Sequence, residues 1–209
     1  PIGAALAAGN TVVFKVASDT AWSGALLMEA FREAGLPDGV VNYVTGGGAE
    51  VGEALVRHPD VAGITFTGST EVGRGIARRF GEGRWPRPCI AEMGGKNPVI
   101  VTRHADLERA AMGIYRSAFG LQGQKCSATS RVLVERPAMD ELVARLARLA
   151  DEAPVGDPTL RRNWMGPVIN AAARERFRKV SAEASSAGTV FAGARELAER
   201  LVARGFSLP

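Results

Sequence analysis

A cysteine lies at the end of a glycine-rich and amide-rich segment of the chain. Residues 120–128 read Gly-Leu-Gln-Gly-Gln-Lys-Cys-Ser-Ala, so that Lys125 directly precedes Cys126. A neighbouring cation and the backbone N–H groups of a glycine-rich turn both favour the thiolate, which is the form that attacks carbonyl carbon. Cys126 is therefore a candidate nucleophile. The alternative interpretation is a small cysteine that simply packs inside a glycine loop.

A carboxylate, Glu92, ends the apolar run 89–91 and is followed by Met93 and two glycines. We expect this run to be a strand of a parallel sheet, and ligands bind beyond the carboxyl ends of such strands. Partial burial there would raise the pKa of Glu92 toward neutrality and suit it to act as a general base. The alternative is a carboxylate that caps the glycine turn or pairs with Lys96.

A third candidate is the segment 66–73, Phe-Thr-Gly-Ser-Thr-Glu-Val-Gly, in which an apolar run leads through a glycine into a helical pattern. Free N–H groups at a helix start, together with the Ser69 hydroxyl, can bind phosphate. The segment is not a Walker motif, because no Lys-Ser/Thr pair follows Gly73, and the chain has no G-x-G-x-x-G fingerprint. A plain helix N-cap is the alternative interpretation.

Short apolar runs and amphipathic stretches alternate around these residues. The pattern predicts strands at 11–15, 40–45, 63–67 and 88–93, with helices at 20–34, 50–57 and 68–80 between them. Single helices between strands indicate an α/β fold with a doubly wound parallel sheet, that is, a Rossmann-like layer of the kind that binds dinucleotides.

The pattern changes after Gly94, where we place a domain boundary between residues 1–93 and 94–209. The second part predicts an α/β domain with strands at 97–102 and 130–135 and a loop at 120–127. Its helices are expected at 105–119, at 139–150 and from 170 onward, and a short strand is a candidate at 189–191.

The composition excludes several classes of protein. Of the 209 residues 46% are hydrophobic, which is typical of a globular chain and not of disorder. No apolar run reaches the length of a membrane helix. The two cysteines form no disulfide framework and the two histidines are far apart, so we predict no metal site and a cytoplasmic location.

The net charge of +4 comes from 22 arginines and 4 lysines set against 22 acidic residues. These arginines are spread along the chain and no aromatic side chains interleave with them, so they predict solvated helix faces rather than a nucleic-acid surface. A basic RNA-binding module is the alternative for the charge.

Taken together and in order, the strand ending at Lys15 and the segments 66–73, 92–96 and 123–126 resemble the aldehyde dehydrogenase superfamily. Cys126 lies 34 residues after Glu92, which is also the spacing in that family. The resemblance extends from residue 7 to residue 169. Segments 40–44, 90–96 and 117–128 look most like the bacterial 1-pyrroline-5-carboxylate (glutamate-semialdehyde) dehydrogenase branch.

The resemblance implies the chemistry. Cys126 would attack the aldehyde carbon to give a thiohemiacetal, and transfer of hydride to NAD or NADP would leave a thioester. Glu92 would then activate the water that releases the acid. The implied substrate is L-glutamate 5-semialdehyde, an intermediate of proline degradation. A broader aliphatic or semialdehyde dehydrogenase and a non-catalytic relative are alternatives, whereas Glu92 argues against a CoA-acylating enzyme.

The resemblance also implies a cofactor site. Lys15 would bind the adenosine ribose, Ser69 the pyrophosphate and the Met93 backbone the carboxamide. Four further residues would shape the adenine side: Gly48, Gly52, Phe66 and Val72. The complete implied set is Lys15, Ser18, Gly48, Gly52, Phe66, Thr67, Gly68, Ser69, Val72, Met93 and Gly94.

Two positions depart from the usual family pattern. Val16 follows Lys15 where proline is usual, and we expect this to loosen the turn only slightly. Ser18 stands where NAD-preferring members often carry glutamate. A glutamate would hold two ribose hydroxyls and repel a 2′-phosphate, and a serine does neither. We therefore predict that NADP is tolerated.

The resemblance places other parts of the family's machinery outside these 209 residues. The oxyanion asparagine would precede Pro1, and the glutamate that holds the nicotinamide ribose would follow Pro209, as would the segments that read the substrate and pair subunits. Loss of an oxyanion donor alone costs about 10²–10³ in rate. We therefore expect a central fragment with little turnover by itself, from an enzyme that forms homo-oligomers.

Overall fold

The computed structural model describes residues 1–82 and 85–194. Contacts within the chain divide it into two units, Pro1–Met93 and Gly94–Pro209, each described here by itself. The division falls at Gly94, where the sequence pattern also changes.

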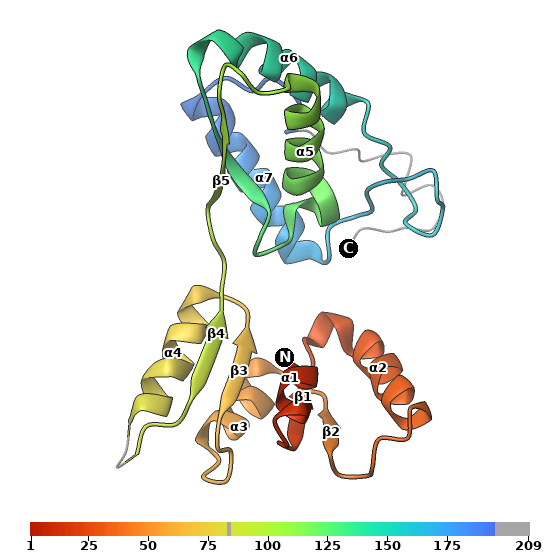
Figure 1. Ribbon diagram of the computed structural model, residues 1–209, viewed down its shortest axis with the longest axis vertical. Coiled ribbons are helices and arrows are strands. Elements are labelled where there is room, and N and C mark those ends of the chain that lie inside the picture. Colours follow the sequence, from red (N-terminus) through yellow and green to blue (C-terminus); the bar gives the residue numbers. More distant parts are fainter. Residues whose placement is uncertain (83–84, 195–209) are drawn as a thin grey trace. The chain divides into compact units, whose positions relative to one another are not determined.

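The first unit is built from short parallel strands joined through helices (Figure 1). Its strands and main helices are β1 (Val12–Lys15), α2 (Ala21–Glu33), β2 (Val41–Val44), α3 (Glu53–Arg57), β3 (Ile64–Thr67), α4 (Thr70–Gly81) and β4 (Cys89–Glu92). Three short helical pieces complete it: α1 (Ile2–Ala7), a 3₁₀ turn (Ser18–Thr20) and a π-helical turn (Gly48–Gly52). The π-helical turn takes the place of the first residues of the helix predicted at 50–57.

The strands of this unit are parallel, as predicted, but their hydrogen-bonded ladders are short. β1 pairs with β2, and α2 connects the two strands along the chain. β3 pairs with β4 in the same way, and α4 connects them. In the described part of the chain the ladders therefore join the strands two by two instead of running through all four. Each pair with its crossover helix is a βαβ unit, so the α/β class with a parallel, Rossmann-like layer is confirmed.

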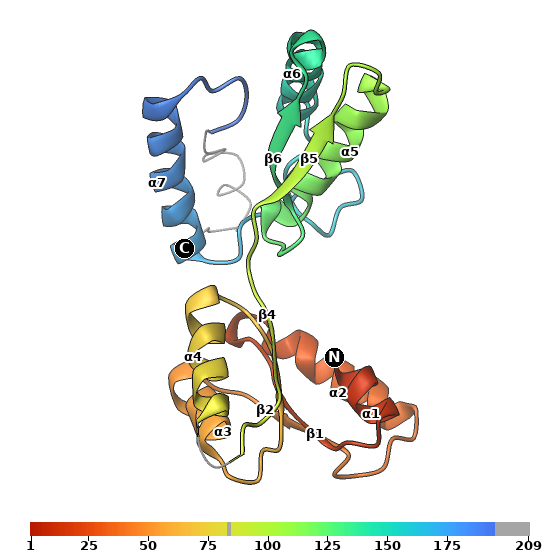
Figure 2. The same ribbon diagram turned by 60° about the vertical axis from the view of Figure 1, so that its left-hand side comes forward.

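Helix α4 shows how local sequence builds this unit. The Ser69 hydroxyl accepts a hydrogen bond from the N–H of Val72 and so caps the helix start. Gly73, Ile76 and Phe80 recur at helical spacing and are buried, and α4 lies beside β4 in both views (Figure 1, Figure 2). Ile76 and Phe80 form the core of this unit together with Val56 of α3.

The second unit contains a third parallel βαβ unit followed by helices. Its elements are β5 (Asn97–Val101), α5 (Leu107–Phe119), a 3₁₀ segment (Gly120–Gly123), β6 (Thr129–Val134), α6 (Arg136–Asp151) and α7 (Ala171–Ala187). Asp106 caps α5 by accepting hydrogen bonds from two N–H groups of its first turn. α5 packs beside α6 and β6 (Figure 2). Its buried residues Ala111 and Ile114 form the core with Val101 and Leu142.

Two further sequence predictions concern the end of the chain and membranes. Residues 189–191, predicted as a short strand, lie in no strand. The helical pattern predicted beyond residue 194 lies outside the described residues. Within the described ranges no helix is long and apolar enough to cross a membrane.

Candidate functional site

The backbone that leads to Cys126 has an unusual conformation. Leu121, Gln122 and Gly123 follow α5 with φ angles of 52°, 56° and 69°. Left-handed conformations are unfavourable for residues with a Cβ, and such outliers cluster at functional sites. The chain then makes a turn in which the N–H of Ala128 donates to the carbonyl of Lys125 at 3.2 Å.

Cys126 lies within this turn and is exposed, unlike a cysteine packed inside a glycine loop. The side chain of Gln124 holds the preceding backbone, since its Nε2 donates to the Leu121 carbonyl at 3.2 Å. Its Oε1 accepts from the N–H of Ile169 at 3.3 Å and so links the segment before α7 to the cysteine loop. The arrangement presents an accessible thiol on a backbone held from within its own unit.

A residue to which the sequence pattern assigned no role also contacts this loop. The Nδ2 atom of Asn97, at the start of β5, donates to the carbonyl of Cys126 at 2.7 Å and to that of Ala128 at 3.1 Å. The signal that could have pointed to Asn97 is its place directly before Pro98, which has no N–H for the strand ladder.

Glu92 lies at the carboxyl end of β4 and pairs in register with Thr67 of β3. Side chains alternate along β4, and the side chain of Glu92 is on the exposed side. The partial burial invoked from the sequence is therefore not found in the structure. Its backbone carbonyl accepts from the N–H of Gly68 at 3.0 Å. Lys96, the alternative partner, belongs to the second unit.

The segment 66–73 places Ser69 at the start of α4. Ser69 acts as the helix cap, which was the alternative interpretation, and the positive end of the α4 dipole lies at the same place. Gly68 packs closely on Phe66, because a Cβ atom there would lie 2.5 Å from the Phe66 ring. A Cβ at Gly73 would lie 2.7 Å from Sδ of Met93, which shows that Met93 packs on α4.

The other cofactor candidates follow β1 and β2. Lys15 ends β1 and its Nζ donates to the carbonyl of Val16 at 2.8 Å. The hydroxyl of Ser18 donates to the carbonyl of Gly46 at 3.4 Å, so that Ser18 lies against the glycine loop after β2. A Cβ at Gly48 or Gly52 would meet no atom within 4 Å, which leaves the backbone of this turn open to a ligand.

The structure thus groups the predicted residues by strand pair. Lys15 and Ser18 lie with the glycine turn after β1 and β2, and the segment 66–72 lies with Glu92 and Met93 after β3 and β4. Cys126 and Gly94 belong to the second unit. No cluster of three or more His, Cys, Asp or Glu side chains suited to a metal occurs in the parts of the chain that the structure describes.

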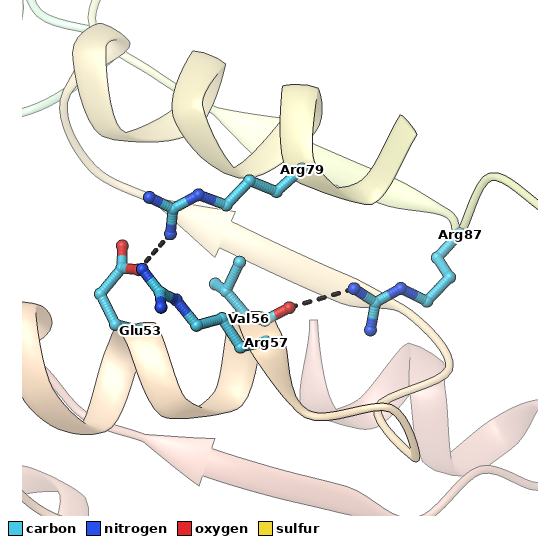
Figure 3. A network of polar contacts seen from close by, with 5 residues as sticks. All are labelled: Glu53, Val56, Arg57, Arg79 and Arg87. Carbon is cyan, nitrogen blue, oxygen red and sulfur yellow. Dashed lines mark hydrogen bonds and ion pairs between the residues drawn. The ribbon is translucent and has the colours of Figure 1, made fainter. Parts of the chain in front are cut away.

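A polar network that the sequence pattern did not predict joins α3 to α4. Glu53, the first residue of α3, forms ion pairs with Arg79 of α4 and with Arg57 of α3 itself (Figure 3). The hydrogen bond from the Arg79 guanidinium holds the pKa of the Glu53 carboxyl below its ordinary value. The network therefore ties α3, which follows the turn at Gly48–Gly52, to α4, which Ser69 caps.

Arg87, just before β4, closes the other end of α3. Its guanidinium donates to the carbonyl group of Val56 at 3.0 Å (Figure 3). It also donates to the carbonyl groups of His58 and Val61, each at 3.0 Å. It also lies 3.9 Å from the centroid of the Phe80 ring, a cation–π arrangement. The end of α3 is thus capped by a side chain from a distant part of the chain.

The sequence that forms these elements and motifs matches the model of a known protein family. The family model described as "Aldehyde dehydrogenase family" matches residues 1–207. The chain belongs to the aldehyde dehydrogenase family. The match extends over both units, and the family resemblance deduced from the motifs is confirmed.

Three relatives of this aldehyde dehydrogenase chain show which branch it is similar to. It is 49% identical over 179 residues, 83% of the chain, to the "1-pyrroline-5-carboxylate dehydrogenase 1" of Halalkalibacterium halodurans. It resembles the structure of a Thermus 1-pyrroline-5-carboxylate dehydrogenase with bound NAD, with a TM-score of 0.86, 38% identity and 92% of the chain covered. It also resembles the structure of proline utilization A from Bdellovibrio bacteriovorus, with a TM-score of 0.86, 41% identity and 91% of the chain covered.

The chain covers only part of each relative. It spans 35% of the Halalkalibacterium protein, 38% of the Thermus chain and 20% of the Bdellovibrio chain. These relatives therefore place the chain in an enzyme family and near one branch of it.

Proposed function

We propose that the protein containing this chain is an NAD(P)-dependent aldehyde dehydrogenase that oxidises L-glutamate 5-semialdehyde, the open form of 1-pyrroline-5-carboxylate, to glutamate. The observation that carries the proposal is the exposed Cys126 on its hydrogen-bonded turn, in a chain 49% identical to a protein named 1-pyrroline-5-carboxylate dehydrogenase 1. The substrate follows from that name and from the similarity to a proline utilization A protein.

The chemistry that we assign to the side chains proceeds in two stages. The Cys126 thiolate forms a bond to the aldehyde carbon, and the carbonyl oxygen takes a proton to give a thiohemiacetal. Removal of the C–H hydrogen with its two electrons, and loss of the hydroxyl proton to solvent, turns this adduct into a thioester. Glu92 then takes a proton from water, whose oxygen attacks the thioester; the C–S bond breaks, the acid leaves and the thiol is restored.

A nicotinamide dinucleotide is compatible with the residues of the first unit. Ser69 lies at the positive end of α4, the open backbone of Gly48 and Gly52 lets a ligand approach closely, and the side chain of Val72 is 51% exposed. Lys15 would hold the adenosine ribose, and Phe66 and Val72 would lie on the adenine side. When bound, NAD(P) supplies the two-electron acceptor that the thiohemiacetal needs.

The remaining assignments are part of the same proposal. We assign residues 1–93 to NAD(P) binding and residues 94–209 to catalysis. We place the protein in the cytoplasm, because a cysteine nucleophile needs a thiol that stays reduced. We also expect the full-length enzyme to form homo-oligomers.

The first prediction tests the nucleophile. In the full-length protein that contains this chain, Cys126→Ser is expected to lower the rate of NADH formation from 1-pyrroline-5-carboxylate by about a thousandfold or more, because a serine hydroxyl is a far weaker nucleophile. Cys89→Ser is the matched control, since Cys89 is half-buried on the first unit's core, and it is expected to keep activity within about fivefold.

The same assay separates the proposed role of Glu92 in hydrolysis from the formation of the thioester on Cys126. Glu92→Gln is expected to release a first burst of NADH, followed by turnover slowed by about 10²–10⁴, because acylation needs no hydrolytic water. A Cys126→Ser protein with wild-type turnover would refute the proposed function. Faster turnover of another aliphatic aldehyde than of 1-pyrroline-5-carboxylate would refute only the substrate.

A further inference from the structure

The pairing of β5 with β6 is irregular at its first residue. Asn97 is in register with Thr129 and Pro98 with Arg131, so Ser130 is an extra residue in β6. Such bulges occur beside functional sites, where they re-aim a side chain, and Pro98 has no N–H to restore the regular ladder. The irregularity lies directly beside the turn that carries Cys126.

The side chain of Asn97 takes over the hydrogen bonding at this place. Its amide nitrogen donates to the carbonyl of Cys126 at 2.7 Å and to that of Ala128 at 3.1 Å, on either side of Ser127. Gly95 lies against the same amide, because a Cβ there would be 3.1 Å from Oδ1 of Asn97. The Asn97 amide is thus held between Gly95 and the turn that carries Cys126.

We propose that Asn97 is a positioning residue for Cys126. Its side-chain amide holds the backbone of the nucleophile by donating a hydrogen bond to the carbonyl group of Cys126. This inference rests on the proposed role of Cys126 as the nucleophile. The turn has one backbone hydrogen bond, from Ala128 to Lys125, and it follows two residues, Leu121 and Gln122, in a disfavoured conformation. The two bonds from Asn97 offset that cost and restrict the turn to one conformation.

The expected consequence is a loss in the chemical step without a loss of cofactor binding. A displacement of about 1 Å at a reacting atom can lower a rate by about 10²-fold. A small alkylating reagent needs no such alignment, so its reaction with Cys126 should change little. These two expectations separate positioning from a general effect on the thiol.

The experiment compares Asn97→Ala and Asn97→Asp in the full-length protein. Aspartate has the size of asparagine but, when ionised, donates no hydrogen bond. Both variants are expected to lower kcat by about tenfold to a hundredfold, while KM for NAD and the rate of iodoacetamide labelling at Cys126 stay within about threefold. Amide hydrogen exchange in a peptide spanning 120–130 is expected to become faster.

Asn42→Asp is the matched control, because the Asn42 amide also donates to a backbone carbonyl, that of Gly39, at 2.8 Å in the first unit. It is expected to leave kcat unchanged. Wild-type kcat in both Asn97 variants, or loss of the fold in both by circular dichroism, would overturn the inference. If Cys126→Ser keeps its activity, the proposed function itself fails, so the two failures are distinguishable.

Discussion

At the scale of single residues, the contacts around Cys126 and Ser18 are the ones that bear on chemistry. Cys126 is exposed on a turn that follows left-handed Leu121 and Gln122 and is held by Asn97. Ser18 lies against the loop after β2 through its bond to the Gly46 carbonyl. Both residues lie in the connections between the main strands and helices, Ser18 in a 3₁₀ turn and Cys126 in a loop turn, where binding and catalytic residues are commonly found.

Ser18 carries the prediction on cofactor choice. Ser18→Glu is expected to raise the preference for NAD over NADP by about tenfold or more, because a carboxylate can accept from two ribose hydroxyls and repels a 2′-phosphate. The measurement is the ratio of kcat/KM for the two cofactors in the full-length protein.

Ser23→Glu, on the exposed side of α2, is the matched control for this change of charge. It is expected to leave the ratio within about twofold of the unchanged protein. An unchanged protein that already favours NAD by about a hundredfold would contradict the prediction of NADP tolerance.

At the scale of elements, the network of Glu53, Arg79 and Arg87 fixes where α3 begins and ends. Arg79 ties the first residue of α3 to α4, and Arg87 binds the Val56 carbonyl near the end of α3 and stacks on Phe80. A helix of five residues has little stability of its own, so these contacts and the burial of Val56 hold it in place.

This network predicts a pH dependence of stability. The hydrogen bond from Arg79 lowers the pKa of Glu53 in the folded state, so the carboxylate contributes stability that is fully present above the ordinary pKa of glutamate. The contribution is lost as the pH falls through the lowered folded value. Glu53→Gln is therefore expected to lower the Tm at pH 7 and to have a much smaller effect in strong acid.

The measurement is thermal unfolding of the 209-residue chain followed by circular dichroism across the acidic range. Glu50→Gln, in the neighbouring π-helical turn, is the matched control and is expected to shift the Tm little at any pH. An effect of Glu53→Gln that stays constant from pH 7 to strong acid would contradict the assigned ion pair.

At the scale of the whole molecule, the chain consists of two units with separate cores. Val56, Ile76 and Phe80 form the core of the first unit, and Val101, Ala111, Ile114 and Leu142 form that of the second. The boundary at Gly94 places Glu92 in one unit and Cys126 in the other. The family model matches both units, and the chain spans between 20% and 38% of the relatives described above.

The core of the second unit carries the last prediction. Leu142 of α6 is 1% exposed, and Leu142→Ala is expected to lower the free energy of unfolding of this unit by about 2–5 kcal/mol, because it leaves a cavity. Hydrogen exchange of α5 peptides measures the change. Leu133→Ala is the control: Leu133 is 56% exposed on β6, and a loss of less than about 1 kcal/mol is expected. Equal losses would contradict this placement of the core.

Much of the fold could be predicted from the sequence because it depends on near neighbours. The helix predicted at 68–80 corresponds to α4, whose bounds differ from the prediction by two residues at its start and one at its end. The α/β class followed from the alternation of predicted strands and helices, and the family followed from the order of the motifs. The strand expected at 189–191 was wrong, since a short β-branched and aromatic run needs a partner strand to become one.

The amino-acid sequence by itself determined the α/β class, the family and the candidate roles of Cys126 and Glu92, because these depend on residue types and spacing along the chain. Only the tertiary structure decided which strands pair, that Asn97 holds Cys126 across 29 residues, and that Glu53 meets Arg79 across 26. The physical reason is the distance along the chain over which each interaction acts. Helix periodicity and caps act within a few residues, whereas these contacts exist only after each crossover helix has packed and brought distant backbone together.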